Sequence, residues 1–122
     1  MNGCFDMTRC LIVDEDRTWQ DQVLAYCAGL GLEFVATTCE EDAIQHCASE
    51  MPDVVLVGTR QAAGFIRQLR RLGGDEPIVI HCPEKGDSKA VSQAIWNGAS
   101  DYLLKHCSRE MFDAKLRQSG VL

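Results

Sequence analysis

Charged side chains follow two apolar runs of this sequence at positions where they could handle a phosphoryl group. Asp14 and Glu15 come directly after one run, and Lys105 directly follows another. Neighbouring carboxylates bind Mg²⁺, and a lysine ammonium binds phosphoryl oxygens. A third apolar run ends on Gly58, which adds no side chain. The residue types therefore indicate a phosphate-handling site from which one contributor is missing.

The order of apolar and amphipathic segments predicts which elements carry these residues. Short apolar runs alternate with segments whose apolar residues recur every three or four positions, as strands and helices do. The predicted strands are Arg9–Val13, Glu33–Thr37, Asp53–Val57, Ile78–Cys82 and Asp101–Leu104. Such alternation predicts an α/β fold in which helices cover both faces of a five-stranded parallel sheet. The charged residues and Gly58 then meet at the carboxyl-terminal edge of the sheet.

Each of the five predicted helices carries an apolar stripe and recognisable end signals. The stripes are Trp19, Val23, Tyr26 or Cys27, and Leu30; Ala43, Ile44, Cys47 and Ala48; Phe65, Ile66, Leu69 and Leu72; Ala90, Val91, Ala94 and Ile95; and Met111, Phe112 and Leu116. Thr38 and Glu41 have the spacing of a capping box, and Ser108 is placed to cap the last helix. Glycines at 31, 73–74 and 98 are expected to end helices.

Composition places the chain among acidic globular proteins. It has 122 residues and a net charge of -6, which argues against a nucleic-acid surface. No apolar run approaches the ~20 residues of a membrane span, and residues 1–7 lack the pattern of a secretory signal. We therefore expect a cytoplasmic protein with an extension at 1–7 and one domain at 8–122.

Seven cysteines are spread along the chain without metal-binding spacing. They occupy positions 4, 10, 27, 39, 47, 82 and 107. The count is odd and no Cys-x-x-Cys occurs, so a disulfide framework is not expected. The simplest interpretation is that most are reduced and fill the core, as free cysteine commonly does.

Four stretches together resemble the receiver domain of response regulators, the family of the bacterial chemotaxis receiver. They are Leu11–Asp16, Pro52–Val57, Pro77–Ile80 and Gly98–Lys105. The resemblance spans about Thr8 to the end and implies a flavodoxin-like, doubly wound, three-layer sandwich with strand order 2-1-3-4-5. It also implies a role in two-component phosphorelay signalling, in which a central aspartate accepts a phosphoryl group.

The resemblance assigns roles to individual positions. By position, Asp14 and Glu15 correspond to the carboxylates that hold Mg²⁺. Cys82 and Lys105 correspond to the residues that bind the phosphoryl oxygens. Tyr102 corresponds to the aromatic side chain that switches between inward and outward rotamers.

The decisive position departs from the family pattern. Gly58 stands where the aspartate is expected, and Asp53 lies at the other end of its strand, roughly 16 Å away at ~3.3 Å per residue. Cys82 replaces Ser or Thr and is a weaker donor, while His106 replaces a proline. The loop after Gly58 also looks short. We therefore predict a degenerate pseudo-receiver without catalytic residues or enzyme activity.

Losing the aspartate also changes the expected metal site. Two carboxylates alone bind Mg²⁺ weakly, so no cofactor is required. We expect Lys105 to turn into the pocket instead and to form a standing ion pair with Asp14 or Glu15.

Two classes of function follow. In the first, the chain is an interaction module that binds a signalling protein, an output domain or a second copy through its fourth helix, fifth strand and fifth helix. Trp96 on the fourth helix is either an interface anchor there or a side chain folded over the edge of the core.

In the second class, a ligand, metal or redox signal reuses the vacated pocket. Cys82, His106 and Cys107 are candidates for a soft-metal or redox site, or alternatively ordinary core and loop residues. Arg60, Arg67, Arg70 and Arg71 form a basic stripe that could bind an anion such as a cyclic dinucleotide, or an acidic partner. Its alternative is a solvated helix face.

Overall fold

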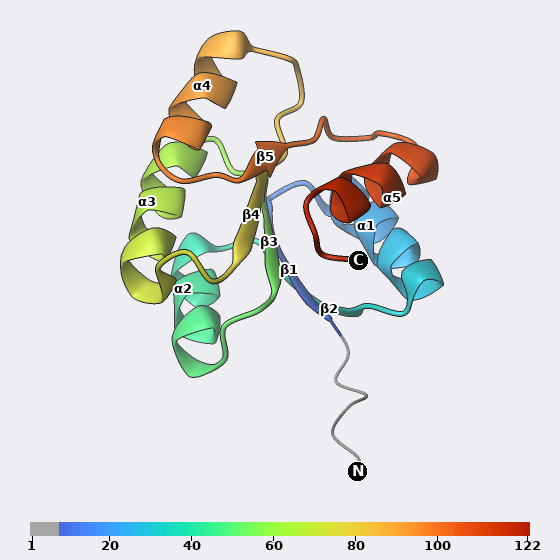
Figure 1. The fold of residues 1–122 in the computed structure, drawn as a ribbon, viewed down its shortest axis with the longest axis horizontal. Coiled ribbons are helices and arrows are strands. Elements are labelled where there is room, and N and C mark those ends of the chain that lie inside the picture. The colour runs from blue at the N-terminus through green and yellow to red at the C-terminus, as the bar shows by residue number, and fades with distance from the viewer. Residues whose placement is uncertain (1–7) are drawn as a thin grey trace.

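Five parallel strands in the predicted order β2-β1-β3-β4-β5 form the centre of the molecule (Figure 1). The computed structural model describes residues 8–122, so the predicted extension at 1–7 lies outside the described residues. The elements are β1 (Arg9–Val13), α1 (Arg17–Leu30), β2 (Glu33–Thr37), α2 (Glu40–Ser49), β3 (Val54–Val57), α3 (Ala62–Gly73), β4 (Ile78–His81), α4 (Ser88–Trp96), β5 (Asp101–Tyr102) and α5 (Arg109–Gln118).

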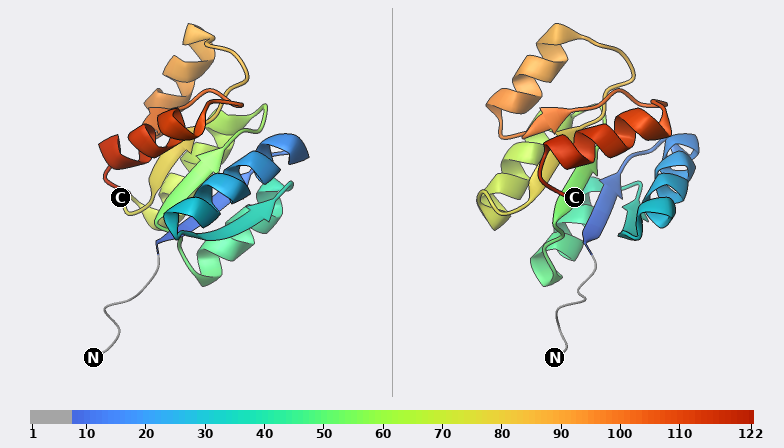
Figure 2. Two further views of the ribbon diagram at one scale, coloured as in Figure 1. Left: turned by 90° about the vertical axis from the view of Figure 1, so that its right-hand side faces the viewer. Right: turned by 45° about the vertical axis from the view of Figure 1, so that its right-hand side comes forward.

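Helices cover both faces of this sheet, which makes three layers. Helices α1 and α5 lie on one face, and α2, α3 and α4 lie on the other (Figures 1 and 2). The first interface buries Trp19 and Phe112 completely, and the second buries Ile66 and Leu69. Because β3 is enclosed on both sides, all four of its residues are buried, which explains its unbroken apolar run.

Helix ends follow local side-chain chemistry, with one predicted cap wrong. Ser108 caps α5 as predicted, since its Oγ accepts from Met111 N–H at 3.2 Å. Gly31 ends α1 in the left-handed region at φ 72°. The predicted capping box does not form, because α2 begins one residue later and Cys39 at its N-cap makes no side-chain bond there. The first-turn acid Glu40 instead accepts from the Thr59 hydroxyl at 2.5 Å.

Three strands are shorter than predicted. Strand β3 begins at Val54 rather than 53, β4 ends at His81 rather than 82, and β5 ends at Tyr102 rather than 104. Beyond β5 the chain still donates from Lys105 N–H to Pro83 C=O at 2.9 Å. Pro83 has no N–H to return the bond, so the ladder stops.

Four residues predicted on the buried stripes are exposed. They are Ala48, Leu72, Ile95 and Met111. Each is the first or last residue of its stripe, where the helix extends past the edge of the sheet face on which it packs. Helix α4 shows this most clearly, because Ala94 is its only fully buried residue. None of the helices in the described part of the chain is long and apolar enough to cross a membrane.

Candidate functional site

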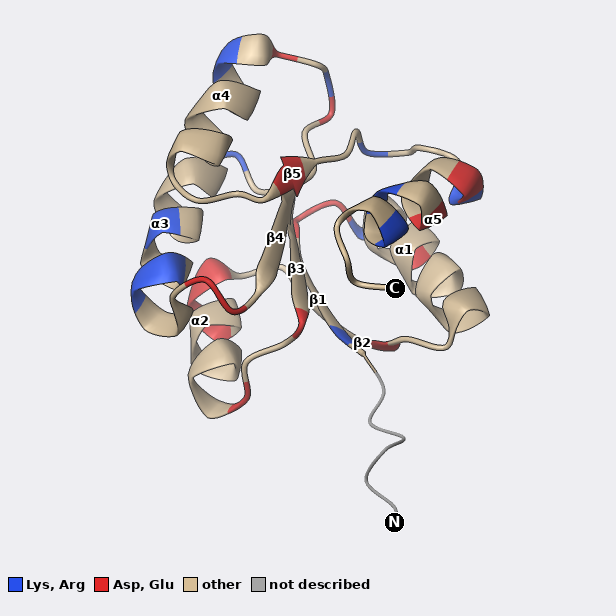
Figure 3. Cartoon of the chain, viewed as in Figure 1, with Lys and Arg blue, Asp and Glu red and all other residues tan. Residues whose placement is uncertain are grey.

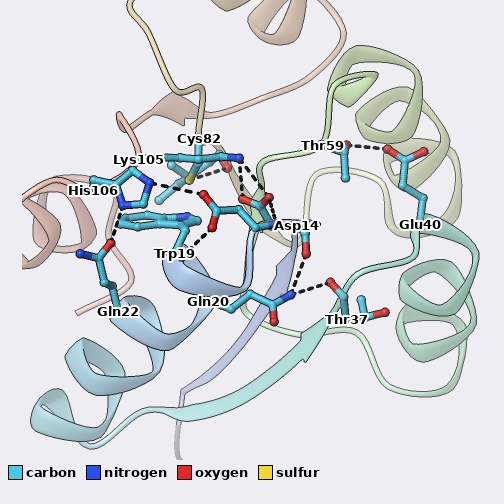
Figure 4. Close-up of polar contacts among 12 residues, drawn as sticks. Asp14, Trp19, Gln20, Gln22, Thr37, Glu40, Thr59, Cys82, Lys105 and His106 are labelled. Carbon is cyan, nitrogen blue, oxygen red and sulfur yellow. Dashed lines mark hydrogen bonds and ion pairs between the residues drawn. The ribbon is translucent and has the colours of Figure 1, made fainter.

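The carboxyl-terminal edge of the sheet brings Asp14 and Lys105 together as a buried ion pair (Figure 4). Asp14 directly follows β1, and Lys105 lies in the loop between β5 and α5. Lys105 Nζ is 3.0 Å from Oδ1 and 3.0 Å from Oδ2 of Asp14, and the two side chains are 6% and 2% exposed. The predicted standing ion pair is therefore present, and Asp14 rather than Glu15 is the partner of Lys105.

This ion pair occupies the space beside Gly58. A Cβ atom placed on Gly58 would overlap Asp14 Oδ2, and it would lie 2.7 Å from Asp14 Cγ and 2.8 Å from Lys105 Cε. Real Cβ atoms essentially never come within 3.0 Å of such neighbours. The side chains of Asp14 and Lys105 would therefore have to move to make room for any side chain at position 58.

Asp14 is anchored from several directions. Its Oδ1 accepts the Asp16 N–H at 2.9 Å, and the Gln20 amide donates to the Asp14 C=O at 2.7 Å. Its Oδ2 lies within ion-pair distance of Lys105 but accepts no hydrogen bond. Burial raises the pKa of the Asp14 carboxyl, an effect that the Asp16 amide and the Lys105 ammonium oppose. The Asp16 amide and Lys105 together therefore favour its negative charge.

The side chains present do not fit a magnesium site. Asp14 is already bound to an ammonium group, and Gly58 supplies no side-chain oxygen. Mg²⁺ needs near-ideal octahedral oxygen coordination, which Glu15 alone does not supply. Within residues 8–122, no group of three or more His, Cys, Asp or Glu residues is placed to hold a metal ion.

A cavity of about 570 Å³ opens above the ion pair. Its walls come from the ends of β1, β3 and β4 and from the loops that follow them. They comprise Asp14, Glu15, Asp16, Gly58, Thr59, Arg60, His81, Pro83, Glu84, Lys85, Asp87, Ala90 and Lys105. The residues predicted at this edge from the sequence were Asp14, Glu15, Gly58, Cys82 and Lys105, and all of them except Cys82 line the cavity.

Cys82 does not line this cavity, and His81 does. Cys82 is fully buried beneath the pocket, and its thiol donates to the Ile80 C=O at 3.8 Å. Burial raises the pKa of this thiol strongly, so it is not an activated thiolate. Side chains alternate along a strand, so His81 and Cys82 point to opposite sides at the end of β4, but the sequence gives no local signal for which side faces the cavity.

His106 and Cys107 make their hydrogen bonds and ion pair with α1 and its N-cap residue. His106 adopts a left-handed backbone with φ 62°. Its Nδ1 lies 2.8 Å from Gln22 Oε1, and its Nε2 lies 3.3 Å from Asp16 Oδ2. Cys107 is half-buried, and its C=O accepts from the Tyr26 hydroxyl at 2.8 Å. The candidate soft-metal residues thus have separate partners.

The four arginines of the predicted basic stripe lie in different environments. Arg60 lines the cavity, whereas Arg67 and Arg71 are exposed on α3 and do not line it. Arg70 is partly buried and donates to Gly98 C=O at 2.8 Å and to Pro77 C=O at 2.7 Å. The four arginines therefore do not form one anion site.

Apolar side chains are exposed on α4, β5, α5 and the segments between them. Trp96 is 89% exposed, so it is not folded over the core edge. Tyr102 points outward, and the Lys115 ammonium lies 5.4 Å from its ring centroid. The other exposed apolar side chains here are Ile95, Leu104 and Met111. We call these five residues the α4–β5–α5 face.

This fold is that of response-regulator receiver domains. No family model matches the chain, and no curated protein resembles it significantly in sequence. A putative response regulator from Chloroflexus aurantiacus superposes with a TM-score of 0.86 at 21% identity, covering 93% of this chain and 98% of that one.

Two further solved structures have the same fold. The chemotaxis protein CheY4 of Vibrio cholerae superposes with a TM-score of 0.85 at 15% identity, covering 93% of this chain and 99% of its own. An atypical orphan response regulator, described as having a phosphorylation-independent regulatory mechanism, superposes with a TM-score of 0.81 at 18% identity. The superposition on the orphan regulator covers 91% of this chain and 93% of that one. At such identities the likeness establishes the fold.

Proposed function

We propose that this chain is a receiver-type module of two-component signalling that works without phosphorylation of an aspartate. One observation carries the proposal: the Asp14–Lys105 ion pair occupies the space of a side chain at position 58. A glycine cannot form an acyl phosphate, and the lysine that would bind the phosphoryl group already has an anionic partner. The structural likeness to an orphan regulator with a phosphorylation-independent mechanism supports this reading.

Chemical phosphorylation tests the proposal. The chain is incubated with acetyl phosphate and Mg²⁺ beside a phosphorylation-competent receiver, and both are analysed by intact mass with and without hydroxylamine. The competent receiver gains a phosphoryl group that hydroxylamine removes, and this chain remains unmodified. A hydroxylamine-labile adduct on this chain would contradict the proposal. A magnesium titration by NMR should likewise show no tight, saturable shifts at Glu15.

We propose that the α4–β5–α5 face binds a protein partner, either a signalling protein or output domain or a second copy of the chain. An exposed tryptophan flanked by apolar side chains is the composition of an interface anchor. Nothing in this role requires a cofactor or an enzymatic step, and we place it in the cytoplasm.

The face can be tested through Trp96 itself. The buried Trp19 also emits, so the Trp96 signal is taken as the difference between the spectra of the wild type and Trp96→Ser. This difference should have the emission of a solvent-exposed indole in dilute protein and should shift to the blue when the face is covered by a partner or by self-association. Sedimentation velocity over a concentration series then distinguishes the two. Association that Trp96→Ser leaves unchanged would exclude this face.

A further inference from the structure

The two outer strands of the sheet differ in how well they are protected from pairing with another chain. Strand β5 has two residues, and its Tyr102 N–H donates to the neighbouring Asp101 carboxylate at 2.7 Å. Short, charged outer strands resist pairing. Strand β2 has five residues, of which only the first, Glu33, is charged, whereas Figure 3 shows β5 as acidic. The outer edge of β2 therefore lacks the protection that β5 has.

The pairing of β2 with β1 shows which backbone groups of β2 are free. Glu33 N–H donates to Thr8 C=O at 2.9 Å, and Thr37 C=O accepts from Asp14 N–H at 3.0 Å. The backbone groups of successive strand residues point to alternate sides. The N–H and C=O groups of the intervening residues 34 and 36 therefore point away from β1. Within residues 8–122 no backbone group pairs with them, so they can pair with another strand.

Exposed apolar side chains flank this edge on both faces of the sheet. Val35 is 43% exposed and points to the α2 side, because it is in register with Leu11 of that core. On the opposite face, the Gln20 amide of α1 donates to Thr37 C=O at 3.1 Å. Leu24 lies one turn further along α1 and is 47% exposed. A strand added to β2 would cover apolar surface as well as bond the free backbone groups.

The side chains of β2 are compatible with a second copy of the same strand. In an antiparallel pair with Val35 opposite Val35, Phe34 of each copy lies opposite Ala36 of the other. The large ring then meets a small side chain, and the two β-branched side chains meet each other, which favours pairing. Glu33 lies opposite Thr37, so no like charges are set against each other in this register.

We propose that two copies of this chain associate by antiparallel pairing of their β2 strands around a two-fold axis at Val35. The N–H and C=O of Phe34 in one copy bond the C=O and N–H of Ala36 in the other, and the symmetry repeats these bonds. The two sheets then continue as one. Strands β2 and β5 lie at opposite margins of the sheet, so the inference does not depend on the role proposed for the α4–β5–α5 face.

Sedimentation velocity over a concentration series tests the inference, with the wild type expected to dimerise reversibly. Ala36→Pro removes an outward N–H and no hydrogen bond to β1. It should weaken dimerisation by about tenfold or more, because a hydrogen bond is lost at each of two symmetric positions. Val35→Lys sets two ammonium groups against each other and should also weaken it by more than about tenfold.

Leu72→Lys is the matched control. Leu72 is an apolar residue of α3 that is 43% exposed, as Val35 is. Its substitution makes the same change in charge away from β2 and should alter dimerisation by less than about twofold. Thermal unfolding verifies that each variant is folded, and Val35→Lys decides the test if Ala36→Pro is not.

Amide hydrogen exchange locates the interface independently. Exchange at Phe34 and Ala36 should slow as the protein concentration rises, because their N–H groups become bonded only in the dimer. Exchange at Val35 should change little, since its N–H faces β1 in both states. The dimer should also form equally in Trp96→Ser.

Three outcomes would overturn the inference. A chain that stays monomeric at the concentrations used for NMR would leave the β2 edge to an extended segment of another protein. Dimerisation that Val35→Lys weakens no more than Leu72→Lys does would exclude β2 as the interface. Dimerisation that is lost in Trp96→Ser and kept in Val35→Lys would assign self-association to the α4–β5–α5 face.

Discussion

The carboxylate of Asp14 lies where a side chain on Gly58 would have to stand, and Lys105 holds it there through contacts of 3.0 Å. We therefore expect that restoring an aspartate at position 58 does not restore a phosphorylation site. Two carboxylates would compete for one space and one ammonium group. We expect Gly58→Asp to remain unmodified by acetyl phosphate and to be less stable than the wild type.

An alanine at position 58 separates the steric effect of a side chain there from the effect of its charge. Gly58→Ala should cost about 1–3 kcal/mol in the free energy of unfolding, because the added methyl group overpacks the site. Gly64, in the first turn of α3, has no atom within 4 Å of its Cβ position. Gly64→Ala should therefore be neutral or should stabilise by up to about 1 kcal/mol. Urea unfolding of the two variants measures the contrast, and equal effects would contradict it.

The ion pair predicts a strong loss of stability when one partner alone is removed. Lys105→Met leaves the Asp14 carboxylate buried without a counter-charge, which typically costs about 3–5 kcal/mol. The double variant Asp14→Asn/Lys105→Met removes both charges and should recover much of that loss. Additive effects of the two single substitutions in a double-mutant cycle would show that the pair is not coupled.

The pH dependence of Lys105→Met follows from the direction of the Asp14 pKa shift. Burial already raises the pKa of Asp14, and removing the ammonium that opposes this raises it further. A raised folded-state pKa means that the native state binds the proton more tightly than the unfolded state. The stability from that proton is complete below the unfolded pKa and is lost as pH rises through the folded pKa. Lys105→Met should therefore regain stability on acidification relative to Asp14→Asn/Lys105→Met, as measured by urea unfolding across pH.

The alternation of segments predicted the parallel sheet, and the resemblance to receiver domains implied its strand order. Much of this edge was predicted as well, because strand ends and charged residues are local signals. Asp14, Gly58 and Lys105 each follow an apolar run, and parallel strands bring such ends together. The prediction that Cys82 belongs to the pocket was wrong, because His81 lines the cavity instead. Which of two successive residues faces the cavity depends on the side of the sheet to which each points, and a run that is buried on both faces does not reveal it. The exposure of Ile95 and Met111 depends on where each helix crosses the sheet margin, which periodicity alone does not encode.

Arg70 was predicted from the sequence to belong to a basic stripe, whereas in the structure it forms hydrogen bonds to two other segments of the chain. It joins α3 to the segment between α4 and β5 through Gly98 C=O and to the start of β4 through Pro77 C=O. Arg70→Ala leaves these carbonyls without their donor, so it should lower the free energy of unfolding by about 2–3 kcal/mol. Arg67→Ala, on the exposed side of α3, should change it by less than about 0.5 kcal/mol. Urea unfolding compares the two, and a similar cost for both would mean that Arg70 acts only as a surface charge.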